Sequence, residues 1–230
     1  TTTPFTQPNS IAIVFDSVFG VPTWLAGLII AVLVWAVIIR GIKSIGRAAE
    51  KLSPLKVGLY LAGGLTVIVM FAHRLPHVLP LVFSEALTTQ SGMGFGWFVA
   101  MRYGIARGVY ANEAGYGTAA LAYGTAKSDR PSQQGLQAVM EVFIVSFVTG
   151  TISALTILVT GVAETSIAAA QAGQAYVTST AAVATAFNAA VPVVGGWVVA
   201  FCAFLFGYTT LIGWSFYGEQ FLEYLFGPRI

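Results

Sequence analysis

Charged side chains are scarce in this chain: 9% of its 230 residues are Asp, Glu, Lys or Arg, whereas 57% are hydrophobic. A soluble globular domain usually has about 25% charged residues, so this composition excludes an ordinary soluble domain. Several apolar runs approach the length of about 20 residues that a helix needs to cross a bilayer. The composition therefore predicts an all-α polytopic membrane protein, with the lipid bilayer as its surroundings.

The chain has a single cysteine, Cys202, which lies inside an apolar run and so excludes a disulfide framework or a thiolate metal cluster. The net charge of +2 is too small to indicate binding to nucleic acid. No Ser–His or Asp–Asp pair falls within an apolar run, so the sequence does not predict an enzyme. The chain starts at Thr1 without a signal peptide, and we expect both of its ends to be cuts through a longer chain.

Apolar runs divide the chain into a single transmembrane domain, residues 1–230, in which residues 1–20 form the tail of a preceding element. The stretch 163–190 has no Lys or Arg and is predicted to be an external loop that carries an amphipathic helix. The loops 41–54 and 125–134 are basic, and the positive-inside rule places both in the cytoplasm, together with Lys56. The predicted spans lie near residues 23–40, 55–72, 94–124, 136–162 and 193–217.

The span 94–124 has an unusual centre, where the polar residues Asn112 and Glu113 stand beside Gly115. An ionised side chain at the centre of a membrane helix costs about 2.5–3.5 kcal/mol on insertion scales, so Glu113 needs a partner, a cavity or a ligand. Irregular backbone survives at this depth only where it is buried in protein or lines a cavity. The pattern predicts a discontinuous helix whose free backbone groups face a small polar ligand or an ion.

A simpler interpretation of the same stretch stays open. Glycine and alanine are common at contacts between membrane helices, and Glu113 could pair with Arg107 near the headgroups.

A second polar group, Thr209 and Thr210, interrupts the apolar run 193–217 and is followed by Trp214. Two adjacent hydroxyls offer the hard oxygen ligands that a sodium ion accepts, and the indole could form a wall for a small substrate. Alternatively, the hydroxyls bond back to the carbonyl four residues earlier and Trp214 is an interfacial anchor.

The segment Arg107 to Leu136, RGVYANEAGYGTAALAYGTAKSDRPSQQGL, resembles the signature of the alanine/glycine:cation symporters. Flanking segments resemble the same family in the same order: QPNSIA from Gln7, GIKSIGRAAEKLSPLKVGLY from Gly41, and TTLIGWSFYGE from Thr209. The resemblance covers nearly the whole chain. It departs from the family at Ala111, where serine is usual, at Gly117–Ala120 in place of GSAP, and at residues 143–146, FIVS in place of FIDT.

This resemblance implies a fold of the leucine-transporter type, a five-plus-five inverted repeat of which the chain is the middle fragment. It would contain about five transmembrane helices, with 94–124 as the discontinuous sixth helix of the repeat. The implied function is symport of a small neutral amino acid, such as alanine or glycine, coupled to Na⁺ or H⁺ in a multi-pass plasma membrane, the inner membrane of a prokaryote. An ion channel or pore is the alternative, because glycine-rich helices and threonine pairs also line ion pathways.

The resemblance also assigns site residues. It implies no cofactor apart from the coupling ion, for which the sodium ligands are Thr209 and Thr210. The 230 residues alone are not expected to transport, because alternating access requires both repeats. The implied substrate contacts are Gln7, Tyr110, Ala111, Asn112, Glu113, Ala114, Gly115 and Trp214.

Overall fold

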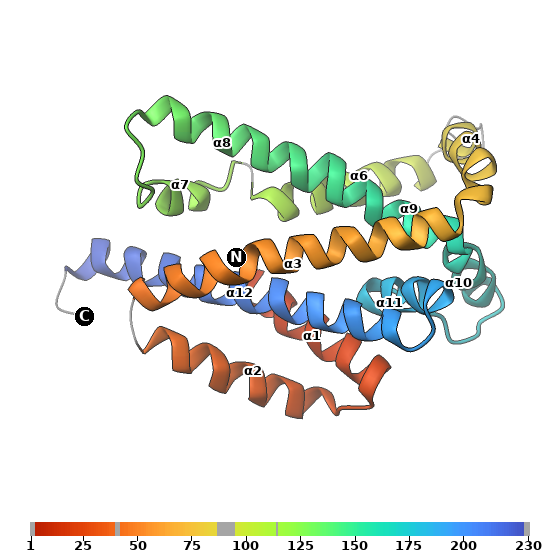
Figure 1. Ribbon diagram of the computed structural model, residues 1–230, viewed down its shortest axis with the longest axis horizontal. Coiled ribbons are helices and arrows are strands. Elements are labelled where there is room, and N and C mark those ends of the chain that lie inside the picture. The colour runs from red at the N-terminus through yellow and green to blue at the C-terminus, as the bar shows by residue number, and fades with distance from the viewer. Residues whose placement is uncertain (1–2, 40–41, 87–94, 114, 228–230) are drawn as a thin grey trace. The chain divides into compact units, whose positions relative to one another are not determined.

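The computed structural model describes residues 3–39, 42–86, 95–113 and 115–227, which form helices joined by short turns (Figure 1). Within these ranges there is no strand, so the all-helical prediction is confirmed for them. One segment, η1, is a 3₁₀ helix and another, η2, is a π-helix. In chain order the elements are α1 (Thr3–Phe19), α2 (Thr23–Ile38), α3 (Ile42–Met70), η1 (Ala72–Arg74), α4 (Leu75–Ala86), α6 (Phe95–Asn112), α7 (Thr118–Tyr123), α8 (Pro131–Phe143), η2 (Ile144–Thr149), α9 (Gly150–Thr160), α10 (Val162–Gln171), α11 (Ser179–Ala190) and α12 (Val194–Phe226).

The chain divides into two compact units, and each is described by itself. Unit 1 comprises Thr1–Met70 and Thr156–Ile230, and unit 2 comprises Phe71–Leu155. In unit 1, α12 contacts α1, α2, α3 and α11, and Figure 1 shows it running between α2 and α3. In unit 2, η2 contacts both α6 and α8.

Helix α12 lies at the core of unit 1, where it contacts α1, α2, α3 and α11. Its glycines allow these neighbours to approach closely. A Cβ atom added at Gly207 would lie 2.6 Å from the Cδ1 atom of Ile11, which is itself 1% exposed. Further along the helix, Tyr208, Ile212 and Phe216 form a buried cluster against side chains of α2 and α3. Close backbone approach through small residues is the usual way in which membrane helices pack.

The stretch 163–190 differs from its prediction as a loop with one amphipathic helix. It forms most of α10 and all of α11, and α11 packs against α12, α1 and α3 with side chains such as Ala186 and Phe187 buried. The side-chain oxygen of Asn188 accepts a hydrogen bond from the Gly196 amide at 2.6 Å, which satisfies one of the amides in the first turn of α12. An alanine-rich segment without Lys or Arg fits a packed helix as well as a loop that carries a surface helix, so the sequence pattern does not separate the two.

Two further intervals are more helical than expected. Residues 1–20, interpreted as a broken tail, contain the 17-residue helix α1 with Pro8 inside it. The predicted loop 41–54 is helical from Ile42 onward and continues through Pro54 into the apolar part of α3. Each proline removes one backbone hydrogen bond, which a helix tolerates when tertiary packing holds the turns on both sides.

Within the described ranges, three helices are long and apolar enough to cross a bilayer: Glu50–Met70, Pro131–Thr160 and Val194–Phe226. They overlap the predicted spans 55–72, 136–162 and 193–217, and the shorter apolar helix α2 lies in the span 23–40. The first two expose large apolar side chains, for example Val69 at 71% and Phe147 at 65%. Exposed apolar side chains on helices of this length are typical of membrane proteins.

The close contact between α11 and α12 predicts that Gly195→Ala destabilises the protein. A Cβ atom at this position would overlap with the backbone carbonyl group of Phe187, which cannot move without shifting α11. We expect a loss of at least about 2 kcal/mol, at the upper end of typical overpacking costs, measured as a fall in the unfolding temperature in detergent. Gly213→Ala on the same helix is the matched control, because its Cβ atom meets nothing within 4 Å and alanine favours a helix. Equal unfolding temperatures for the two variants would contradict this packing.

Candidate functional site

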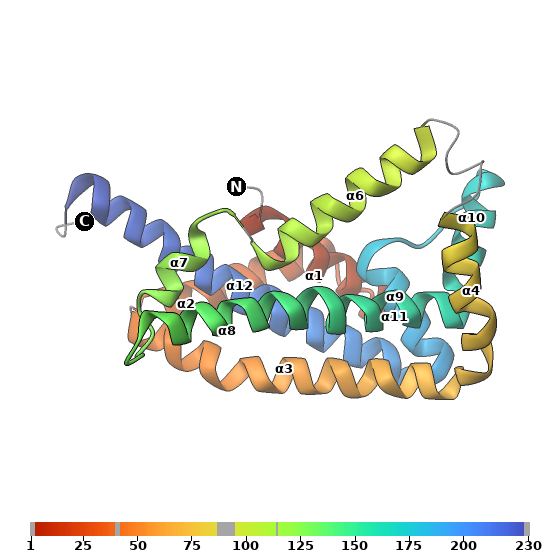
Figure 2. The same ribbon diagram turned by 90° about the horizontal axis from the view of Figure 1, so that it is seen from above.

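The interruption predicted inside 94–124 is present in unit 2, between α6 and α7. Figure 2 shows the non-helical connection, in which Glu113, Gly115 and Gly117 have φ angles of +54°, +82° and +79°. Glycine adopts such angles freely, whereas a glutamate does so at a cost of about 1 kcal/mol or more. The amide of Tyr116 donates to the carbonyl of Glu113 at 3.1 Å and closes a tight turn. Ala114 lies outside the described residues.

Side chains hold this turn on both sides. The carboxylate of Glu113 accepts a hydrogen bond of 2.8 Å from the hydroxyl of Thr118, the first residue of α7. The side-chain amide of Asn112, the last residue of α6, donates to the hydroxyl of Ser146 in η2 at 3.0 Å. Thr118 is buried and Glu113 is half-buried, so the Thr118–Glu113 bond is shielded from solvent. The structure thus gives Glu113 a hydroxyl partner that the sequence analysis did not assign.

The other predicted residues of this turn are its neighbours in the chain. Tyr110 is half-buried on the last turn of α6, whereas Ala111 and Gly115 are exposed. The carbonyls at the end of α6 and the amides at the start of α7 have no partner within their own helices, as at any helix end. The segment therefore offers backbone donors and acceptors beside a carboxylate and an amide.

Gln7, Thr210 and Trp214 share one side of unit 1, where α1 meets α12. The side-chain oxygen of Gln7 lies 3.5 Å from where a Cβ atom of Gly207 would be, so α1 touches α12 at this glycine. Thr210 and Trp214 follow Gly207 by about one and two turns, which places them on the same face of α12. The indole of Trp214 packs edge-on against Tyr217, with ring centres 5.5 Å apart.

Thr209 faces a different neighbour from Thr210, because consecutive helical residues are turned by about 100°. Its hydroxyl oxygen accepts a hydrogen bond from the ammonium group of Lys56 on α3, at 2.6 Å. The same hydroxyl donates to the carbonyl of Leu205 at 2.8 Å, and the Thr210 hydroxyl donates to that of Phe206 at 2.8 Å. Both threonines thus make the bond to the carbonyl four residues earlier that the sequence analysis left open as an alternative.

The sequence analysis missed three side chains that contact its candidate residues: Lys56, Thr118 and Ser146. Lys56 was counted among the cytoplasmic charges, yet it is half-buried and its ammonium also lies 5.0 Å from the centre of the Phe206 ring. The one indication in the sequence was that Lys56 lies just inside the start of an apolar run. Thr118 and Ser146 occur at positions where the sequence departs from the family pattern, which was their only signal.

The predicted site residues fall in both units. Gln7, Thr209, Thr210 and Trp214 belong to unit 1, and the turn 110–115 belongs to unit 2. Within the searched part of the described chain, no cluster of three or more His, Cys, Asp or Glu residues could hold a metal ion. A sodium ion does not need such a cluster, since hydroxyl and carbonyl oxygens serve as ligands in transporters.

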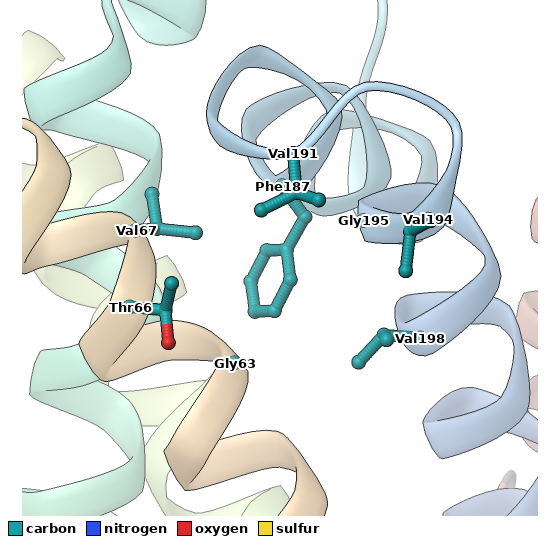
Figure 3. A pocket seen from close by; sticks show the side chains of 8 residues that line it. All are labelled: Gly63, Thr66, Val67, Phe187, Val191, Val194, Gly195 and Val198. Atoms are coloured by element: carbon teal, nitrogen blue, oxygen red, sulfur yellow. The ribbon is translucent and has the colours of Figure 1, made fainter.

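A pocket of about 120 Å³ in unit 1 differs from the predicted site. Figure 3 shows the ring of Phe187 between Thr66 and Val67 of α3 on one side and Val194 and Val198 of α12 on the other. The Thr66 hydroxyl donates to the Ala62 carbonyl at 2.8 Å, and the other lining side chains are apolar. This lining does not suit the two charges of a free amino acid.

The whole chain, residues 1–230, matches the profile of the sodium:alanine symporter family. It is 34% identical over 223 residues to the sodium/alanine symporter AgcS of Methanococcus maripaludis, an alignment that covers 97% of this chain and 48% of that protein. It is also 34% identical over 226 residues to the uncharacterized transporter YflA of Bacillus subtilis, covering 96% and 46% of the two chains. The identity to a sodium/proton-dependent alanine carrier protein of Bacillus sp. strain PS3 is 31% over 233 residues, covering 96% and 51%.

The chain therefore spans about half the length of these relatives. The match over all 230 residues agrees with the helical composition and with the interrupted helix at the signature segment. This chain belongs to the sodium:alanine symporter family.

Proposed function

We propose that the protein is a secondary active transporter that carries a small neutral amino acid, such as alanine or glycine, together with Na⁺ or H⁺. The observation that carries this proposal is the interruption between α6 and α7 in a chain of the symporter family. The relatives named for sodium and alanine support the substrate and the ion. Family membership also argues against an enzyme and against the ion channel that the sequence left as an alternative.

The chemistry of the interruption suits a zwitterion. An amino acid needs donors for its carboxylate and acceptors for its ammonium, and the start of α7 and the end of α6 supply these as backbone groups. Backbone groups can bind both charges while carrying no charge of their own, which avoids the cost of a further unpaired ion. We infer that Tyr110, Ala111, Ala114 and Gly115 contribute to this binding turn. In unit 1, Gln7 and Trp214 are the proposed substrate contacts.

The side chains have separate proposed roles. Asn112 can donate and accept, so it suits a contact with the substrate or the turn. Glu113 repels a carboxylate and therefore serves as a brace that holds the turn through Thr118. Tyr110 and Trp214 limit the volume of the substrate side chain, and Thr209 and Thr210 are the proposed hydroxyl ligands for Na⁺.

We further infer the membrane arrangement. About five spans, with α6 and α7 together forming the discontinuous sixth helix of a leucine-transporter-type repeat, would place the interruption near the middle of the bilayer. Residues 41–54 and 125–134 would lie on the cytoplasmic side of a multi-pass plasma membrane, and residues 163–190 on the outer side. The exposed apolar surfaces of α3 and α8 support contact with lipid.

Counterflow in proteoliposomes tests the transport function. Full-length protein carrying these residues is expected to exchange internal unlabelled alanine for external labelled alanine, and to accumulate alanine against its gradient when Na⁺ is imposed outside. Leucine is expected to compete weakly, because its side chain is larger than those of the small neutral amino acids for which the site is proposed. Passage of ions without accumulation of alanine would support a channel instead.

The hydrogen bond between Thr118 and Glu113 predicts different losses of stability for substitutions of its two partners. Thr118→Val removes a hydrogen bond to a carboxylate, so we expect a loss of about 1.5–3 kcal/mol in stability. Glu113→Gln keeps an acceptor oxygen for Thr118, so its loss should be smaller and the ion dependence of alanine uptake should stay unchanged. Unfolding temperatures and Na⁺ and pH titrations of uptake measure both effects.

The matched control for the brace is Thr125→Val, because the exposed Thr125 hydroxyl bonds to Ala122 within its own turn. We expect this control to stay within about 0.5 kcal/mol of wild type. Loss of the Na⁺ or pH dependence in Glu113→Gln, with alanine binding intact, would show that Glu113 carries the coupling ion and is not a brace.

A further inference from the structure

Lys56 places a positive charge beside Thr209 in unit 1. Its ammonium nitrogen lies 2.6 Å from the hydroxyl oxygen, and the face of the Phe206 ring, which also attracts cations, is 5.0 Å away. The hydroxyl hydrogen is directed at the carbonyls of Leu205 and Phe206, so a lone pair of the oxygen faces the ammonium. A hydroxyl in this arrangement would present the same lone pair to a sodium ion.

We propose that Lys56 competes with Na⁺ for the oxygen of Thr209 and so determines whether this position accepts a sodium ion. While Lys56 is charged, the chain itself supplies the cation, because two positive charges at one oxygen repel each other strongly in a partly buried setting. When that charge is removed, the oxygen is open to Na⁺. The inference deepens the proposed function, on which its meaning for transport rests.

In the described part of the chain, the helices that pack against α3 bring no carboxylate to the ammonium group of Lys56. Helices α2, α11 and α12 pack against α3, and the sequences of α2 and α11 contain no ionisable side chain. On α12, the Cys202 thiol lies 4.0 Å from the backbone carbonyl of Lys56, and the Tyr208 hydroxyl donates to the Leu33 carbonyl at 2.9 Å. Neither of these neighbours is a carboxylate.

The described carboxylates of α3 and α12 stand well away along the helices. Glu219 and Glu223 lie several turns beyond Thr209 toward the C-terminal end of α12, and Glu50 is exposed more than one turn before Lys56. Lys51 is also exposed on α3. Among the described residues, the Lys56 ammonium contacts the hydroxyl oxygen of Thr209 and the aromatic ring of Phe206.

The test measures Na⁺ binding without alanine. For purified full-length protein carrying these residues, the readout is the Na⁺ concentration that gives half of the Na⁺-specific rise in unfolding temperature, with choline keeping the ionic strength constant. We expect Lys56→Met to lower this concentration by about tenfold or more, because the competing charge is gone. Lys56→Arg keeps a charge at the site and should resemble wild type, as should Lys51→Met, which removes an exposed lysine from the same helix.

Adding Thr209→Val to Lys56→Met should abolish the gain, since it removes the oxygen for which the two cations compete. Equal half-points for wild type and Lys56→Met, or a gain that survives Thr209→Val, would overturn the proposal. If Lys56→Met does not fold, Lys56→Gln provides the same comparison with a neutral polar side chain. Absence of alanine transport by wild type counts against the proposed function alone, because the Na⁺ measurement requires no substrate.

Discussion

The packing of unit 1 depends on glycines, which have no side chain, at the contact positions of α12. In a bilayer, lipid tails are as apolar as leucine, so helices associate through close contacts rather than through release of water. Gly195 and Gly207 give α12 two such contacts, one with the backbone of α11 and one with Ile11 of α1. Because these contacts fix the rotation of α12, Thr210 is turned toward the α1 side while Thr209 meets Lys56 of α3.

The interruption of α6 and α7 meets a different requirement. Backbone groups without partners are costly in a membrane, so an open turn persists only where other groups satisfy it. Here side-chain hydrogen bonds hold both flanks of the turn: the Thr118 hydroxyl donates to the Glu113 carboxylate, and the Asn112 amide donates to the Ser146 hydroxyl. The turn is therefore held by hydrogen bonds from side chains on both flanks, in addition to the bond from the Tyr116 amide to the Glu113 carbonyl.

Composition and local pattern were sufficient for the helical class and for the position of the interruption. Polar residues beside glycines in an apolar run indicate a break, and Gly115 and Gly117 have the positive φ angles that such a break requires. Long-range contacts were beyond this reasoning. A lysine near the start of an apolar run has the same local pattern whether it reaches for headgroups or turns inward, and the partner of Lys56 is 153 residues away in the chain. In the same way, the lack of charge in α11 did not distinguish a helix packed in the core from a helix on the surface.

The π-helical segment η2 has a consequence for the continuous helix from Pro131 to Thr160. Its wider turn, in which the Gly150 amide reaches the Val145 carbonyl, accommodates an additional residue relative to an α-helix. The stripes of side chains on α8 and α9 are consequently out of phase, so one rod-like segment presents two differently oriented faces. Shortening η2 by a single residue would bring the two halves back into register and swing the side chains of one half around the axis relative to the other. The hydroxyl that meets Asn112 is thus positioned by helix phase as well as by residue type.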